Sequence, residues 1–200
     1  MMLPVNSIRY TVLFVFLVPV SVLAEEPATL ATAHTIGKKL KQEGWTYGSN
    51  PAQKQIDCVQ FVLKTLEEHF QMTLSADVRT RILISDLTVS QVTNDTNGIV
   101  SMGDSRTKGV QQALIDIHRG TVISLKDAKP GDFIQYWMKK HNGTWFGHAG
   151  IIEKVTEENG IRKAFLYGSH KSTEGIGTAP EGGLRLQGTA DRRIYVVRAQ

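Results

Sequence analysis

Cysteine is almost absent from this chain of 200 residues, which contains Cys58 and no other. A single cysteine excludes an internal disulfide, so its thiol is either an inert core residue or a group retained for its reactivity. Residue type alone favours the inert interpretation, because free cysteines are among the most frequently buried residues. The residues around Cys58 must therefore decide between the two.

The sequence also lacks internal repeats, low-complexity tracts and any concentrated charge. Hydrophobic residues make up 41% of the chain and charged residues 21%, which is ordinary for a globular protein and excludes disordered and fibrous classes. The formal net charge of +4 is spread over short pairs such as Lys38-Lys39 and Arg192-Arg193. We expect no nucleic-acid partner, because such binding needs basic residues clustered on one face. We also expect a monomer.

One long apolar run is present, between Tyr10 and Leu23, and it lies close behind the basic residue Arg9. It ends at Ala24, and two glutamates and a proline follow. This is the layout of a secretory signal peptide cleaved after Ala24, and the run is short for a membrane span. An uncleaved anchor is the alternative. We expect residues 25–200 to form one domain, without a membrane span, exported to the periplasm, the cell wall or the medium.

Hydrophobic periodicity predicts helices in the first part of the chain, at 28–44, 57–70, 108–118 and, more weakly, between Val78 and Leu87. Turn-forming residues predict loops at 45–51, 94–98 and 139–146. Strands are predicted at 133–138, 147–155, 163–167 and 193–198. Asn159-Gly160 is a strong hairpin signal between the second and third of these. Because helices come first and strands follow, we expect an α+β fold, with N-terminal helices packed on a mostly antiparallel sheet.

The position of Cys58 suits a nucleophile, because it directly follows Asp57 at the start of a predicted apolar helix. Asp57 is a good helix N-cap by residue type. In the first turn, the helix dipole and the unpaired backbone N–H groups both favour a thiolate over a thiol. The same N–H groups could hold an oxyanion when a carbonyl is attacked.

A reactive thiol needs a base, and His148 is the best candidate among six histidines. Small residues flank it, and an apolar run that reads as a buried strand follows it. A histidine at the head of such a strand can face a helix terminus. Four other histidines fit surface or loop positions: His34, His69, His118 and His141.

His170 is the candidate third residue, because the predicted hairpin places its strand beside that of His148. A polar group that orients the base usually completes a Cys-His pair. Ser169 is the local alternative for this role. One cysteine and two histidines could also form a zinc site with an open fourth position, but no CxxC or HExxH motif supports it. We expect neither a metal nor a cofactor.

Taken together, these residues resemble the NlpC-type cell-wall peptidase family. Asp57-Cys58-Val59-Gln60-Phe61-Val62 is similar to the nucleophile motif, and Gly147-His148-Ala149-Gly150-Ile151 to the motif of the base. Four further segments match in the same order: Trp45-Thr46-Tyr47-Gly48, Lys129-Pro130-Gly131-Asp132-Phe133, His170 to Ile176 and Ile194 to Arg198. Cys before His argues against circularly permuted relatives, and His170 favours this family over the CHAP amidases.

The resemblance implies a papain-like fold and hydrolysis of amide bonds in peptidoglycan stem peptides. Cys58 would be the nucleophile, His148 its base and His170 the residue that orients the base. It further implies that Tyr47 lines the substrate cleft, and we expect Trp45 and Asp57 beside it. No cofactor is implied.

Two departures from the family pattern matter. Val59-Gln60 replaces Ser-Gly beside the nucleophile, and the segment from Leu74 to Ser105 is longer than usual and could wall the cleft. Two alternatives stay open: an acyltransferase with the same chemistry, and a non-catalytic wall-binding protein. The sequence does not identify the bond that is cut, or whether the wall is the cell's own or foreign.

Overall fold

The computed structural model describes residues 25–83, 98–100 and 103–200. The expected signal peptide at 1–24 lies outside these residues. So do most of the loop expected at 94–98 and the end of the helix expected between Val78 and Leu87. Within the described ranges, no helix combines the length and the apolar character needed to cross a membrane.

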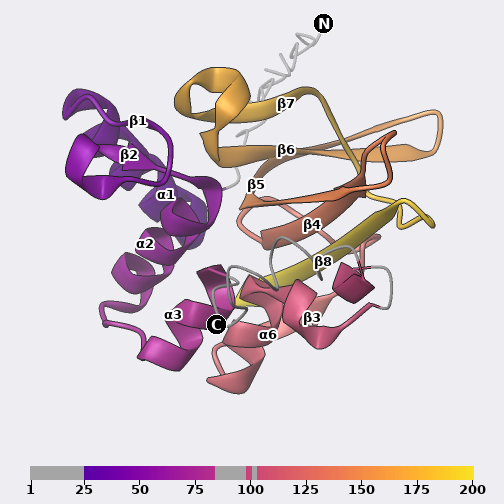
Figure 1. Ribbon diagram of the computed structural model, residues 1–200, viewed down its shortest axis with the longest axis horizontal. Helices are drawn as coiled ribbons and strands as arrows, with labels where there is room; N and C mark the ends of the chain where they lie inside the picture. The colour runs from indigo at the N-terminus through magenta and orange to yellow at the C-terminus, as the bar shows by residue number, and fades with distance from the viewer. Residues whose placement is uncertain (1–24, 84–97, 101–102) are drawn as a thin grey trace, which may run out of the picture.

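The helices precede the six-stranded sheet in the chain and gather to one side of it (Figure 1). They are α1 (Ala28–Gln42), α2 (Cys58–Phe70), α3 (Ala76–Leu83) and the shorter α6 (Val110–Asp116). Two short parallel strands, β1 (Thr46–Tyr47) and β2 (Gln55–Ile56), lie between α1 and α2, with a 3-10 turn at Pro51–Gln53. These strands bring the segment before Cys58 back against the start of α2.

The second half forms a six-stranded antiparallel sheet in the order β3-β8-β4-β5-β6-β7. Its strands are β3 (Gly120–Ile123), β4 (Phe133–Lys139), β5 (Trp145–Glu158), β6 (Ile161–His170), β7 (Gly175–Arg185) and β8 (Arg192–Ala199). The expected α+β fold with helices before an antiparallel sheet is confirmed.

The expected strand boundaries were too short, and four strands were not expected: β1, which lies inside the loop expected at 45–51, β2, β3 and β7. β5 begins at Trp145, inside the segment expected to be a loop, because Trp145 pairs with Lys139 across a tight connection. β3 begins at Gly120, where only a helix end was expected. β7 contains four glycines and a proline, which hide its alternation, although Ile176 and Leu184 are buried in it. Tertiary pairing, not local propensity, makes this segment a strand.

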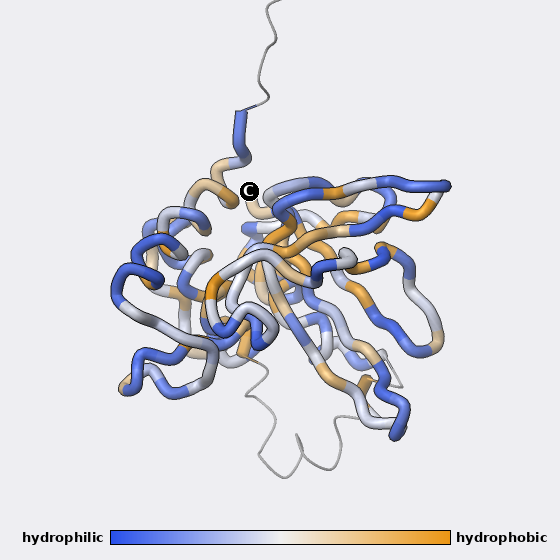
Figure 2. Tube along the Cα trace, turned by 90° about the horizontal axis from the view of Figure 1, so that it is seen from above, coloured by the Kyte–Doolittle hydropathy of each residue, from blue (hydrophilic) through white to orange (hydrophobic). Residues whose placement is uncertain are grey.

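The two faces of the sheet bury different cores, because successive side chains of a strand point to opposite sides. Helices α1, α2 and α6 cover one face and form the main core, around Phe61, Phe133 and Ile151. The other face buries a smaller core of Ile134, Ile152, Leu166, Val196 and neighbours. Figure 2 shows apolar segments concentrated inside the fold and polar ones at its periphery.

Arg162 on β6 closes the smaller core from one side. Its guanidinium donates to the backbone carbonyls of Leu125, Lys126 and Ala128, in the segment that follows β3. The sheet therefore curls, so that segments far apart in the strand order enclose the second core. His148, His170 and their neighbours lie at one end of this curled face.

Candidate active site

Helix α2 begins at Cys58 because the residue before it closes a capping box. The Asp57 carboxylate accepts from the Gln60 backbone N–H at 2.9 Å, and the Gln60 side chain accepts from the Asp57 N–H at 3.0 Å. This reciprocal pair satisfies two backbone donors and fixes the helix start. Asp57 is confirmed as the N-cap, and Cys58 occupies the first helical position with 9% of its surface exposed.

The sulfur of Cys58 lies in a buried pocket of backbone donors. The backbone N–H groups of Ala149, Val59 and Cys58 itself face it and favour its charged form. Burial opposes them and is the larger effect, and the nearby Asp57 charge adds to it, so the pKa of the thiol is raised to about 11. The N–H groups at the helix start favour a thiolate as expected, but desolvation outweighs them.

Ala149 ties the sulfur to β5, the strand that carries the expected base. His148 is the residue directly before Ala149, and its ring packs edge-on against Tyr136 of β4 with 5.6 Å between ring centroids. Its Nε2 lies 2.7 Å from Nδ1 of His170, at the end of the neighbouring strand β6. The structure thus pairs His148 with His170 and places the backbone N–H of the residue after His148 against the Cys58 sulfur.

The hydrogen bonds of His170 determine which nitrogen of each ring carries the proton. Nε2 of His170 lies 3.0 Å from the Leu166 carbonyl oxygen, which can only accept, so this nitrogen donates. In the neutral ring Nδ1 of His170 is then an acceptor, and Nε2 of His148 donates to it. Nδ1 of His148 is left as a free lone pair, which is the state that a general base requires.

Both imidazoles are neutral at ordinary pH. Burial, and to a smaller extent the neighbouring His170, lowers the pKa of His148 to about 3. The pKa of His170 is also lowered, mainly by burial, although the backbone at Leu166 and Gly177 opposes the shift. With the thiol pKa raised, the resting pair is a thiol beside a neutral imidazole, not a thiolate beside an imidazolium.

Ser169, the alternative third residue, points away from this group. Its hydroxyl donates to the Ile56 backbone carbonyl at 2.6 Å and is fully buried. Because neighbouring residues of a strand point to opposite faces, His170 lies beside His148 while Ser169 anchors β6 to β2. The geometry therefore brings His170, and not Ser169, to the candidate base.

Tyr47 lies close to the nucleophile, whereas Trp45 does not line the same space. The pKa of Tyr47 is raised by burial and then by the charges of Cys58 and Asp57, which places its hydroxyl within their reach. Trp45 packs against the main core, donates from its indole to Glu43 at 3.0 Å, and lines a separate pocket of about 260 Å³ with Leu63 and others. Both stay predictions as substrate-binding residues.

Tyr136 is the site residue that the sequence analysis missed. It lies directly opposite His148 in the β4–β5 pair and is 7% exposed. Burial and the charge of Cys58 raise its pKa to about 12, while Arg192 opposes this shift. The signal that could have found it is the register between β4 and β5, which the expected loop at 139–146 obscured.

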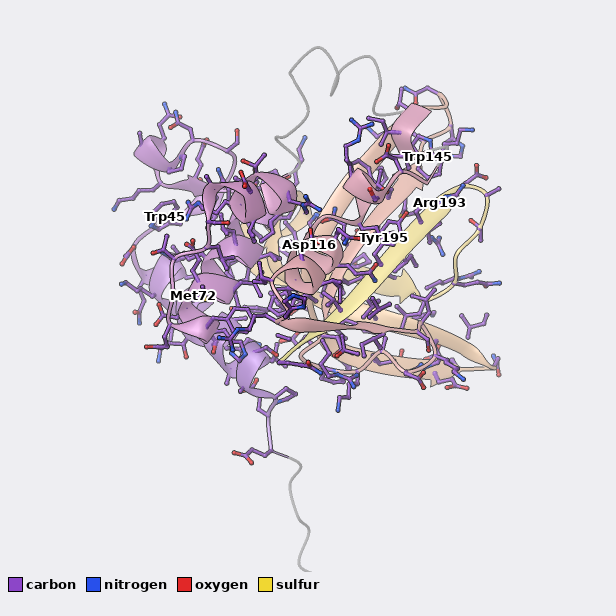
Figure 3. The ribbon with its side chains drawn as sticks, turned by 90° about the horizontal axis from the view of Figure 1, so that it is seen from below. Trp45, Met72, Asp116, Trp145, Arg193 and Tyr195 are labelled. Atoms are coloured by element: carbon purple, nitrogen blue, oxygen red, sulfur yellow. The ribbon has the colours of Figure 1, made fainter. Side chains whose placement is uncertain are left out.

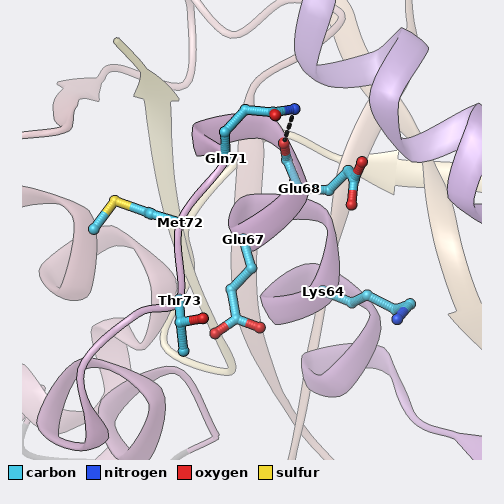
Figure 4. A pocket seen from close by; sticks show the side chains of 6 residues that line it. All are labelled: Lys64, Glu67, Glu68, Gln71, Met72 and Thr73. Carbon is cyan, nitrogen blue, oxygen red and sulfur yellow. Dashed lines mark hydrogen bonds between the residues drawn. The ribbon is translucent and has the colours of Figure 1, made fainter.

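A pocket of about 420 Å³ follows the solvent side of α2 and is lined by Lys64, Glu67, Glu68, Gln71, Met72 and Thr73 (Figure 4). Gln71 donates to the Glu68 carbonyl across it at 3.2 Å. Its helix positions face away from Cys58, which points to the sheet. This pocket is therefore separate from the Cys58 group.

Within the described ranges, no cluster of three or more His, Cys, Asp or Glu side chains could hold a metal ion. The zinc alternative thus finds no ligand set there. Searches of family models, curated proteins and solved structures find no match to this chain. The function of the site is therefore inferred from its own residues and their geometry.

Proposed function

We propose that this protein is an exported cysteine hydrolase with an NlpC-type, papain-like core that cleaves amide bonds in peptidoglycan stem peptides. The observation that carries the proposal is the polarised chain from the Leu166 carbonyl through His170 to Nε2 of His148. These hydrogen bonds leave Nδ1 of His148 unprotonated and able to act as a base. The next residue on the strand, Ala149, contacts the Cys58 sulfur through its backbone N–H. A buried cysteine with a structural role would need no such arrangement.

In the first half-reaction, the Cys58 sulfur attacks the amide carbonyl carbon as its proton passes to Nδ1 of His148. A carbon–sulfur bond forms, and the carbonyl electrons move to oxygen. The backbone N–H groups at the start of α2 face the developing oxyanion. The oxyanion then collapses, the carbon–nitrogen bond breaks, and His148 gives its proton to the leaving amine. The acyl group remains on sulfur as a thioester.

In the second half-reaction, water attacks the thioester while His148 accepts its proton. The carbon–sulfur bond breaks, the thiol recovers the proton, and the carboxylic acid leaves. Through both halves, Nδ1 of His170 accepts a hydrogen bond from the Nε2–H of His148 and so keeps the His148 ring in the correct tautomer. It acts through His148 and so is a positioning residue.

The substrate class rests on the sequence resemblance, since the site itself indicates only acyl transfer from an amide. Peptidoglycan stem peptides fit an exported protein, because they lie outside the cytoplasmic membrane. Tyr47, within electrostatic reach of Cys58 and Asp57, would contact the substrate next to the scissile bond.

An acyltransferase is the second candidate, and the burial of the catalytic group favours it. Cys58 is 9% exposed and His170 is 3% exposed. A thioester shielded from water lives longer and can pass its acyl group to an amine. Hydrolysis and transfer differ only in the acceptor.

Peptidoglycan digestion followed by mass spectrometry tests the proposal. The chain from residue 25 onward should release fragments with a new carboxyl and a new amine terminus, and Cys58→Ala should release none. Adding an amine such as glycinamide separates the two candidates, because a transferase would give amide products in place of free acids. Wall binding without turnover would support a non-catalytic protein and contradict the proposal.

A further inference from the structure

Four polar side chains form a row across four neighbouring strands at the site end of the sheet. His170 on β6 contacts His148 on β5, and His148 packs against Tyr136 on β4. Arg192 begins β8, diagonally across from Tyr136, since Tyr136 pairs with Ile194 and Met138 pairs with Arg192. Two of the four belong to the proposed catalytic group, and the other two extend the row away from it.

Arg192 faces the same side of the sheet as Tyr136. Ile194 and Val196 pack in the smaller core with Tyr136, and Arg192 is two residues before Ile194 on the same strand. The effect of the Arg192 charge on the pKa of Tyr136 agrees with this placement. Since strands are spaced by about 4.8 Å and Arg192 is offset by two residues along its strand, its backbone lies roughly 12 Å from that of His148.

The guanidinium of Arg192 has unused hydrogen-bonding capacity. Among the residues that the structure describes, its buried Nε has no hydrogen-bond partner, and its Nη1 donates to the Arg185 carbonyl at 3.4 Å. Within the described residues no carboxylate forms an ion pair with it. A half-buried guanidinium without a carboxylate partner is a strong site for a planar carboxylate.

The other basic residues of this region have partners. Arg198, further along β8, forms a bidentate pair with the buried Asp132 at 2.7 and 2.9 Å. Arg193, the next residue, points to the opposite face, where it lies over the Trp145 ring at 5.6 Å. Figure 3 shows Trp145, Arg193 and Tyr195 along this opposite face. Arg192 is therefore the cation of β8 that is left for a ligand.

The surface between Arg192 and His148 is aromatic and partly open. Phe146 is 38% exposed and lies edge-on to Tyr136, with 6.5 Å between the ring centroids. Nζ of Lys140 lies over the Phe146 ring, 5.8 Å from its centroid. A peptide with its scissile bond at Cys58 could lie along these rings. At about 3.5 Å per extended residue, about three residues span the distance between His148 and Arg192.

We propose that Arg192, with Tyr136 beside it, forms a carboxylate-binding subsite for substrates held at Cys58, two or three residues from the scissile bond. The subsite selects acidic peptides over their amidated counterparts. It deepens the proposed function, on which its substrate class rests, because stem peptides carry free carboxylates. The geometry of the subsite itself does not depend on which amide is cut.

Affinity labelling of Cys58 tests this subsite without any need for turnover. The probes are chloroacetyl-glycyl-D-alanine and its C-terminal carboxamide, which alkylate sulfur with loss of chloride. Each places its terminal group about 8 Å from the reacting carbon. The wild-type thiol should react with the acid roughly tenfold faster than with the amide, as expected for one charge-assisted hydrogen bond.

Three variants at neighbouring positions make the result specific. Arg192→Gln should bring the acid-to-amide ratio close to one. Arg193→Gln removes the same charge from the opposite face and should keep the wild-type ratio. Arg192→Lys keeps the charge and should retain part of the preference for the acid. The rate with the amide probe shows whether each variant is folded, so a misfolded Arg192→Gln protein would be recognised.

Several results would overturn the subsite. They are a ratio near one in the wild type, a wild-type ratio in Arg192→Gln, or an equal loss in Arg193→Gln, which would indicate a general effect of net charge. Failure of the proposed function is separate. A protein that keeps the acid preference but leaves peptidoglycan intact has the subsite and another acidic substrate. Digestion without any acid preference removes the subsite alone.

Discussion

At the end of the sheet that carries the candidate site, the polar side chains on the two faces make different kinds of contact. On the face toward the helices, polar side chains complete the fold: Ser169 donates to the Ile56 carbonyl, Gln111 to the Val196 carbonyl and Trp137 to the Thr107 carbonyl. On the opposite face, His170 and His148 contact each other and Tyr136 follows. A side chain that completes the fold and a candidate catalytic side chain are thus neighbours in sequence, as Ser169 and His170 are on β6.

Gln135 is the exception that limits this comparison. It lies on the helix face, is 1% exposed, and neither its side-chain nitrogen nor its oxygen finds a hydrogen-bond partner in the described residues. The geometry gives no account of its unpaired amide. At the other positions named above, the helix face carries the structural hydrogen bonds and the opposite face carries the candidate catalytic residues. Single substitutions on each face test this difference.

Removing the base should have the largest effect. His148→Ala leaves the Cys58 thiol, with its raised pKa, without a proton acceptor. We expect kcat/KM for a peptidoglycan peptide to fall by about 10³-fold or more. Steady-state assays should show this with an unchanged circular dichroism spectrum. A fall of less than tenfold would mean that another group takes the proton.

His170 and Ser169 form the sharpest matched pair across the two faces. His170→Ala should lower kcat by about 10- to 100-fold, because the His148 tautomer is then no longer fixed. Ser169→Ala should leave kcat close to wild type and reduce the free energy of unfolding by about 1 kcal/mol, through loss of one buried hydrogen bond.

A positioning role for His170 has its own signature in the pH dependence of kcat. His170→Asn, which can still accept from His148, should recover part of the activity lost in His170→Ala. The acid limb of the profile should move in the alanine variant only. Equal kcat losses in His170→Ala and Ser169→Ala would contradict the separation of the two faces.

The pH dependence of alkylation tests the neutral resting pair. The pKa of Cys58 is raised from 9.0 to about 11, so the thiolate fraction is small at neutral pH and grows as pH rises. The rate with iodoacetamide should climb about tenfold per pH unit up to about pH 9 and keep rising beyond it, because the thiolate is the nucleophile. A rate that is flat from about pH 5 to about pH 8 would instead indicate a thiolate–imidazolium pair.

The smallest effect is expected at the edge of the cleft. Tyr47→Ala removes a side chain within reach of Cys58, so KM should rise about three- to tenfold while kcat changes little, as for loss of uniform binding. Trp45→Ala is the comparison, because Trp45 lines a separate pocket and should leave KM near wild type. An unchanged KM in Tyr47→Ala would remove this residue from the cleft.

Local features of the sequence predicted much of the fold, the start of α2 and the proximity of His148 to His170. The start of α2 could be found because Asp57 caps it through contacts within four residues. His148 and His170 could be placed together because the Asn159-Gly160 turn joins their strands. In each case the information lies in adjacent residues or in one hairpin.

What the sequence did not reveal depends on tertiary packing. Tyr136 can be assigned to the site only when the register of β4 against β5 is known. In the sequence, Arg192 is one of a scattered pair of basic residues, and only the pairing of β8 with β4 places it near the site. The raised thiol pKa is set by burial under strands nearly a hundred residues away, which the helix-terminus reasoning could not include. Strand β7 is hidden by its glycines and proline.

The most direct test of the central claim is digestion of purified peptidoglycan by the chain from residue 25 onward, compared with Cys58→Ala by mass spectrometry. The account predicts stem-peptide fragments with the wild type and none with the variant, and the fragment masses identify the bond. Intact peptidoglycan in both samples, from several wall types, together with a thiol that resists alkylation even at high pH, would mean that Cys58 is structural and would contradict the account.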